Sequence, residues 1–254
     1  MIVRDAGPDL LLITQPDHAA VAAHIMACWR AQDFPTRATR HLALYATAHH
    51  DLGWAVEDAA PRVNPDTRRP LDFTEVDRAT RQALWPRAVG EMAERSVYAA
   101  ALIAQHAITI HRRFWSEPQW SSFFDTMEQL RDRWFTAGAP AGGPPPGVPA
   151  DPPPENRLSF LQDYGVVRMG DLASLLFCTA WTHTEELDGY ELRARNGVVE
   201  VSPDPFEGRS VPLAVVARRV PARRYAGDGD LGNALAAAPG VTMTGRIVGV
   251  EALA

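Results

Sequence analysis

The chain has 254 residues, of which 46% are hydrophobic and 22% charged, so its composition is that of a folded globular protein with material for a substantial core. The formal net charge of −6 argues against nucleic acid as a general partner, and all 25 basic residues are arginine, which excludes lysine Schiff-base chemistry. We find no signal-peptide pattern and no apolar run of about 18 residues, and therefore expect a cytoplasmic protein that does not act at a membrane.

The first half of the sequence predicts a short strand pair followed by helices. Residues 2–14 are apolar on both sides of a turn at Gly7-Pro8-Asp9, which indicates two paired strands. Helical periodicity and capping residues then predict helices at about 16–31, 37–50, 75–90, 93–114 and 118–136. Residues 54–72 are rich in proline and aspartate and predict a loop. The helix at 93–114 is apolar nearly all round, so we expect its neighbours to bury it.

The second half contains a change of pattern. Residues 138–154 carry eight of the 21 prolines and predict an extended surface loop, after which a helix resumes over about 155–181. Beyond Trp181 the period becomes two, with a hairpin signal at Asn196-Gly197, strands at 211–217 and 241–250, and a short helix at 230–237. The sequence therefore predicts a mainly α protein: a helical body at 1–181 and a small α/β, β-rich subdomain at 182–254.

Several polar residues lie on apolar helix faces, where a core residue would be expected. His18 shares a stripe with Val21 and Ile25, and Asp171 shares one with Val167 and Leu175. A buried carboxylate without a partner costs several kcal/mol, so such a residue requires an arginine, a helix N-terminus or a metal. Imidazole and carboxylate together suit divalent manganese, iron, cobalt, nickel and zinc. We therefore predict one or two such ions, with these metal ligands: His18, His50, Asp51, His106 and Asp171.

Each of these residues also has an ordinary structural interpretation. A single core histidine such as His106 is more often hydrogen-bonded than metal-bound. The pair His50-Asp51 could simply end a helix, where a histidine favours the dipole. Asp171 could be an N-cap after Gly170. The metal interpretation gains from the ordered occurrence of His, His-Asp and Asp on three separate predicted helices.

The order His18, His50-Asp51, Asp171 resembles the motif of the HD-domain superfamily of metal-dependent hydrolases. Over essentially its whole length the chain more closely resembles a bacterial family, the DUF3891 proteins, through residues 13–19, 50–54 and 171–175. The resemblance implies an HD-domain-like helical bundle in which a metal-activated water attacks a phosphate ester, with Asp51 as a catalytic residue. DUF3891 itself supplies no established activity.

Further residues are candidates for supporting such a site. Side chains that could orient the ligands or contact substrate are Gln15, Asp17, Trp54, Asp58 and Gln105. Phe73 could help to wall a pocket, and the arginines that could stabilise charge are Arg40, Arg62, Arg81 and Arg168. The expected partner is a small, possibly phosphorylated molecule. Two alternatives stay open, a di-iron oxygenase and a non-catalytic ligand-binding module, and the sequence leaves the oligomeric state undetermined.

Overall fold

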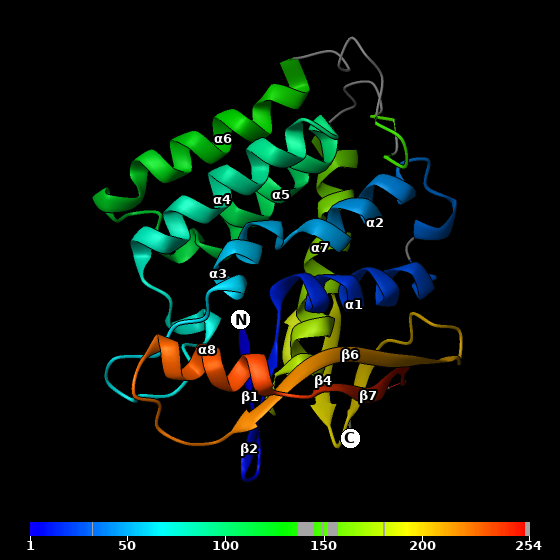
Figure 1. Cartoon of the computed structure of the whole chain (residues 1–254). Helices are drawn as coiled ribbons and strands as arrows, with labels where there is room; N and C mark the ends of the chain where they lie inside the picture. The colour runs from blue at the N-terminus through cyan, green and yellow to red at the C-terminus, as the bar shows by residue number, and fades with distance from the viewer. Residues whose placement is uncertain (32, 137–144, 149, 152–156, 180, 252–254) are drawn as a thin grey trace.

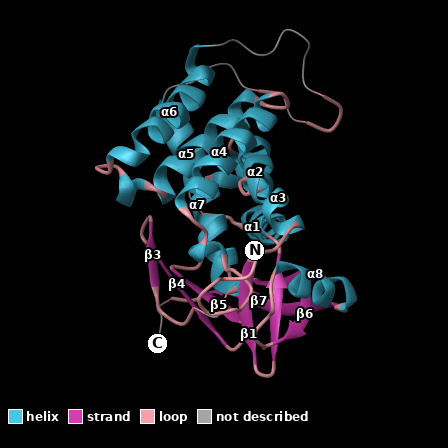
Figure 2. Cartoon of the chain, turned by 60° about the vertical axis from the view of Figure 1, so that its left-hand side comes forward, coloured by secondary structure: helices cyan, strands magenta, loops and turns pink. Residues whose placement is uncertain are grey.

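Helices occupy one half of the molecule and a β-sheet the other, as the computed structural model shows (Figures 1 and 2). The structure describes the chain except for residues 32, 137–144, 149, 152–156, 180 and 252–254. Most of the predicted loop at 138–154 therefore lies outside the described residues. Among those that are described, no helix combines the length and the apolar character needed to cross a bilayer.

The sheet has seven strands in the order β1-β2-β6-β7-β5-β4-β3. The bounds are β1 Ile2–Ala6, β2 Asp9–Ile13, β3 Glu185–Leu187, β4 Tyr190–Arg195, β5 Val198–Ser202, β6 Ser210–Pro221 and β7 Gly240–Gly249. β5 and β7 are parallel and the other neighbours antiparallel. β2 pairs with β6, with Leu10 opposite Val220, so strands from both ends of the chain form a single sheet.

Eight α-helices and five short 3₁₀ helices occur in the described residues. The α-helices are α1 Gln15–Cys28, α2 Arg40–His49, α3 Ala55–Ala59, α4 Arg78–Ala93, α5 Val97–Ile110, α6 Ser121–Thr136, α7 Arg157–Cys178 and α8 Asp228–Ala237. The 3₁₀ helices are η1 Phe34–Thr36, η2 Leu52–Trp54, η3 Phe73–Glu75, η4 Arg112–Phe114 and η5 Pro118–Trp120. α3 lies within the predicted loop at 54–72, whereas the predicted helix at 93–114 divides into α5 and η4.

Two large apolar cores meet along α7. One core lies between the sheet and the helices α1 and α7, and includes Ile25, Phe177 and Leu213. The other joins α2, α4, α5 and α6 to the first half of α7, and includes Trp85 and Leu102. α8 covers the opposite face of the sheet beside β2 and β6 (Figure 1). Because α7 contributes to both cores, the middle of α7 lies where the two cores meet.

The predicted fold class, a mainly α HD-domain-like bundle with a small β-rich subdomain, is wrong. Of the described residues, 52% are helical and 21% belong to a seven-stranded, mixed, curled sheet that forms a half-barrel. The N-terminal strand pair is part of this sheet, and α1 and α7 bury their apolar faces on it. The sheet is therefore one of the two layers of the fold, and it includes strands from both predicted ranges, 1–181 and 182–254.

Candidate metal centre

His18 is positioned by the first turn of α1. The Thr14 hydroxyl caps this helix by accepting from the Asp17 backbone N–H at 3.1 Å, and Pro16 occupies the first turn, where its missing N–H has no cost. One turn further, the His18 side chain is fully buried, with its Nδ1 2.7 Å from the Ser174 hydroxyl of α7. That hydroxyl donates to the Asp171 backbone carbonyl at 3.0 Å, so it accepts from Nδ1–H. Nε2 of His18 is thereby left with its lone pair.

His50 and Asp51 follow the end of α2. The buried Nδ1 of His50 lies 2.7 Å from the Thr47 backbone carbonyl, to which it can only donate, so the lone pair of a neutral imidazole is again on Nε2. This Nε2 atom is buried and has no hydrogen-bond partner among the described residues. Gly53 lets η2 approach α4, because a Cβ there would lie 2.6 Å from the Leu84 carbonyl oxygen.

Asp171 lies in the middle of α7, so it is not an N-cap, and its two oxygens face different imidazoles. Oδ1 lies 3.4 Å from Nε2 of His18 and 3.3 Å from Nε2 of His50, whereas Oδ2 lies 3.6 Å from Nε2 of His106 on α5. Gly170 permits this position, since a Cβ there would lie 2.9 Å from side-chain atoms of both α1 and α2. α7 therefore approaches the two helices closely just beside Asp171.

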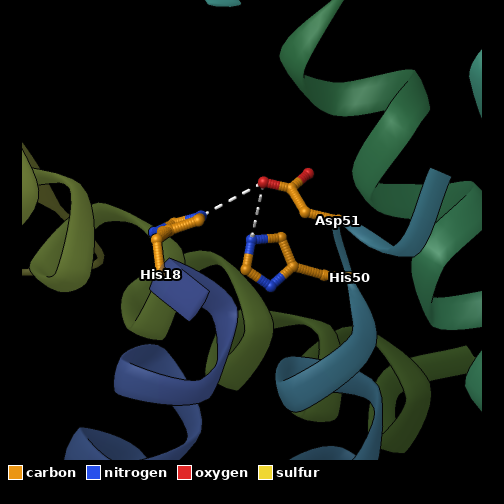
Figure 3. A group of neighbouring side chains, drawn as sticks. All are labelled: His18, His50 and Asp51. Carbon is orange, nitrogen blue, oxygen red and sulfur yellow. Dashed lines mark hydrogen bonds and ion pairs between the residues drawn. The ribbon is translucent and has the colours of Figure 1, made fainter. Parts of the chain in front are cut away.

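The Asp51 carboxylate completes the cluster. Its Oδ2 lies 3.1 Å from Nε2 of His18 and 3.6 Å from Nε2 of His50 (Figure 3). An ion bound at about 2.0–2.2 Å to nitrogen and oxygen ligands holds neighbouring ligand atoms about 3.0–3.5 Å apart. The measured spacings of 3.1–3.6 Å are close to this range. Two overlapping groups could hold a metal ion, His18 with His50 and Asp51, and His50 with His106 and Asp171.

The electrostatics of the cluster favour a bound cation. Burial alone would lower the pKa of His50, but the Asp51 and Asp171 carboxylates raise it to about 9. Burial would raise the pKa of both carboxyls, yet the neighbouring imidazoles hold them below their usual range. Burial lowers the pKa of His106 to about 4, so this imidazole is neutral at pH 7. In the absence of a metal, a proton on His50 supplies the positive charge that the carboxylates require.

The cluster borders a cavity of about 500 Å³. Asp51, His106 and Asp171 line this cavity at the cluster, and Trp54, Phe73, Trp85, Ile110, Leu175 and Trp181 contribute aromatic and aliphatic walls. Polar groups on the remaining wall are Gln15, Thr74, Arg81, His111 and Arg113. A small molecule could therefore reach the carboxylates and imidazoles from this side.

The structure places the predicted supporting residues in different surroundings. Gln15 lines the cavity and its buried Oε1 has no hydrogen-bond partner among the described residues, while Trp54 forms part of the wall. Asp58 is buried behind Gln15, accepts from its backbone N–H at 2.6 Å and pairs with the Met1 amino group. Asp17 accepts from the Thr14 hydroxyl at the helix cap, and Gln105 contacts Thr109 and Arg131. Neither Asp17 nor Gln105 lines the cavity.

Of the four candidate arginines, Arg81 alone lines the cavity. Arg40 donates to the Ala27 carbonyl, Arg62 pairs with Glu57 and Asp77, and Arg168 pairs with Asp188. Sequence reasoning missed Ser174, which fixes the His18 tautomer, although its position three residues after Asp171 places both on one helix face. It also missed Arg113, for which no local pattern in the sequence provides a signal.

Comparison with known proteins gives the family alone. No curated protein and no solved structure matches the chain at a significant level. The model of one family, described as "Protein of unknown function (DUF3891)", matches residues 1–222. That match includes α1, α2, α5 and α7, and hence every residue of the cluster. The chain thus belongs to the DUF3891 family.

Proposed function

We propose that the protein is a metal-dependent hydrolase that cleaves a phosphate ester of a small molecule. The observation that carries the proposal is the arrangement of Nε2 lone pairs. In His18 and His50 the Nδ1 atoms are engaged by Ser174 and Thr47, and both Nε2 atoms face carboxylate oxygens at 3.1–3.6 Å. Lone pairs directed at carboxylate oxygens repel these oxygens unless a proton or a metal cation lies between them.

The ligand set suits a divalent transition metal. Two ionised carboxylates and three neutral imidazoles carry a charge of −2, which a divalent ion offsets. Nitrogen and oxygen ligands in this mixture suit manganese, iron, cobalt, nickel and zinc. His18, His50, Asp51 and Asp171 would hold one ion. His106, which faces the other oxygen of Asp171, would either extend this ligand set or help to hold a second ion.

The chemistry would take place where the cluster meets the cavity. A divalent ion supplies an activated water at neutral pH and orients the phosphate oxygens. Oδ2 of Asp51 faces the imidazoles, and its other oxygen points away from both of them (Figure 3). Because Asp51 also lines the cavity, this second oxygen is available to accept a proton from the attacking water.

The choice of reaction class rests on the order of the ligands. The order of His18, His50-Asp51 and Asp171 resembles that of HD-domain hydrolases, whose usual chemistry is phosphate-ester hydrolysis, although the chain does not have their mainly α bundle fold. Cationic groups in the same cavity, Arg81 and Arg113, support an anionic substrate. We therefore favour hydrolysis over an oxygenase reaction.

Metal content tests the site directly. We expect the protein to retain about one to two divalent ions per chain on purification, by elemental analysis. His18→Ala should lower this content sharply, because it removes one of the ligands that face both carboxylates. The matched control is His24→Ala on the same helix, since His24 is exposed and its one hydrogen bond within the described residues is to the Pro212 carbonyl, at 3.0 Å. Equal metal content in the two variants would contradict the site.

Activity tests the reaction class. The metal-loaded protein should release phosphate or alcohol from a panel of phosphate mono- and diesters. Asp51→Asn should lower the turnover rate by more than about 100-fold. His24→Ala should retain the activity. A metal-loaded protein that hydrolyses no ester of the panel but consumes O₂ when it holds iron would instead be an oxygenase.

A further inference from the structure

Two arginines from different elements face the cavity beside the metal centre. Arg81 comes from the first turn of α4, and Arg113 from η4 after the end of α5. Both line the same space as Asp51, His106 and Asp171. Neither side chain contributes to the metal centre, so their presence there requires a separate explanation.

Arg81 is held in place and retains donors without partners. Its Nε donates to the Val76 carbonyl at 2.8 Å, and its Nη2 donates to the Thr74 carbonyl at 2.5 Å. A guanidinium carries five N–H donors, so three remain, and they have no hydrogen-bond partner among the described residues. An oriented guanidinium with free donors matches the geometry of an oxyanion.

Arg113 adds a second positive charge that no carboxylate pairs with in the described part of the chain. Its guanidinium lies 4.7 Å from the centre of the Phe114 ring. Burial lowers the pKa of Arg81, and the nearby charge of Arg113 lowers it further. Asp77 offsets the charge of Arg81, but it also lies 3.5 Å from Arg62. A bound anion would relieve the repulsion between the two arginines.

The two arginines line the cavity near His111. Their charges act on His111, which follows His106 by five residues, or about 7.5 Å along a helix axis. The Trp85 ring packs against both histidines, with its centre 5.8 Å from that of His106 and 6.1 Å from that of His111. The path from the metal ligands to the arginines is therefore walled by an aromatic ring.

We propose that Arg81 and Arg113 form a subsite for an acidic group of the substrate that is distinct from the phosphate ester cleaved at the metal centre. The substrate then has three parts, namely a reacting ester, an apolar middle that packs on Trp85, and a distal phosphate, sulfate or carboxylate. Anion binding at the two arginines is inferred from their positions and free donors alone, whereas the assignment of this anion to the substrate rests on the proposed hydrolase function.

Binding of inorganic phosphate to the metal-free protein tests the subsite without any need for catalysis. By calorimetry, the double variant Arg81→Gln, Arg113→Gln should bind phosphate at least about tenfold more weakly than the wild-type protein. Arg113→Gln alone should weaken binding as well, and because Arg113 is exposed this variant keeps its fold. The matched control is Arg78→Gln on α4, an exposed arginine outside the cavity, which should bind as the wild type does.

The location of bound phosphate is tested by His50→Ala, which removes a metal ligand but leaves both arginines. Metal-free His50→Ala should bind phosphate with wild-type affinity. Phosphate binding that survives both arginine substitutions, or that is lost in His50→Ala with the arginines intact, would overturn the subsite.

Esters that differ by one acidic group test the assignment to substrate. An aryl phosphate that carries a carboxylate on a short chain opposite the ester should have a lower KM than the same ester without it. Arg113→Gln should reduce this difference in KM, whereas the control Arg78→Gln should preserve it. Equal KM values for the two esters in the wild-type enzyme would overturn the assignment. If no ester is hydrolysed at all, the proposed function fails, while phosphate binding at the arginines still decides the subsite.

Discussion

The tautomers of two histidines determine what the cluster can bind. Thr47 and Ser174 accept from the Nδ1 atoms of His50 and His18, and each contact leaves an Nε2 lone pair directed at the carboxylates. Neither partner is itself a metal ligand. Such partners raise the basicity of a ligating imidazole and fix its orientation. The site is therefore arranged for a cation by hydrogen bonds that lie behind the ligands.

The stability of the metal-free protein should depend on pH through these histidines. The carboxylates overcome burial and raise the pKa of His50 to about 9, from 6.5 in the unfolded chain. The folded state therefore binds a proton that the unfolded state releases, so this stabilisation is complete below pH 6.5 and is lost as the pH rises to about 9. Burial lowers the pKa of His106 and His111 to about 4, so stability also falls as the pH drops from 6.5 toward 4. Melting temperatures in the presence of a chelator should therefore peak near pH 6.5.

The metal-loaded protein should lack the alkaline decline, because the ion takes the place of the His50 proton. Metal-free His50→Ala should lack it too, while keeping the acid decline from His106 and His111. A decline between pH 6.5 and 9 that persists in His50→Ala would assign the effect to another group.

The sequence indicated those candidate site residues that stand out from their neighbours along the chain. The pair His50-Asp51 at a helix end before Gly53, and single polar residues such as His18 on apolar stripes, could be recognised from their spacing together with the resemblance to known motifs. The structure brings the five predicted ligands close together, in two overlapping groups that share His50. Arg113 could not be recognised, because an exposed arginine after a helix is common in proteins. Its candidate role in anion binding becomes apparent only in the fold, where it lines the same cavity as Arg81.

At the element scale, the approach of α7 to α1 and α2 sets the position of Asp171. A Cβ on Gly170 would lie 2.9 Å from Met26 Cγ and from Thr47 Cγ2, and 3.2 Å from the Ala22 carbonyl oxygen. Gly170→Ala should therefore push the helices apart. Overpacking of this kind costs about 1–3 kcal/mol, more than the gain of up to about 1 kcal/mol in helix propensity. We expect a lower free energy of unfolding and, because Asp171 moves with the helix, weaker metal binding.

Gly165 on the same helix provides the control. A Cβ there would meet only Asp188 Oδ2, at 3.7 Å, which is ordinary contact distance. Gly165→Ala should thus leave metal affinity unchanged and unfold at the same or slightly higher denaturant concentration. Denaturation by urea and metal titration of the two variants give the comparison. Equal metal affinities in the two variants would mean that the helix contact at Gly170 does not position Asp171.

At the scale of the whole molecule, pairing between distant strands determines the fold class, and this is what the sequence could not indicate. Alternation at 211–217 predicted a strand there, and Gly7-Pro8-Asp9 predicted a strand pair, but nothing local shows that β2 pairs with β6 about 200 residues later. β6 also extends to Pro221. The two consecutive charged residues Arg218 and Arg219 obscure, in the sequence, the alternation of buried and exposed residues along this strand. The helices were predicted individually, while the surface on which α1 and α7 pack was assigned to a separate subdomain.

The sheet should therefore be required for the helical layer to fold. Of the strands that the structure describes, residues 1–181 contain β1 and β2 alone. A fragment of this length would therefore expose the apolar faces with which α1 and α7 cover β4, β5 and β6, including Ile25 and Phe177. Each large apolar side chain left in water costs about 1.5–3 kcal/mol, and a few of them equal the whole stability of a typical domain. We expect the fragment to be insoluble or to lack a cooperative thermal transition and bound metal, and co-expression with residues 182–254 to restore both. A monomeric 1–181 fragment that unfolds cooperatively and retains its metal would show instead that the helices form an independent domain, with the sheet as an accessory.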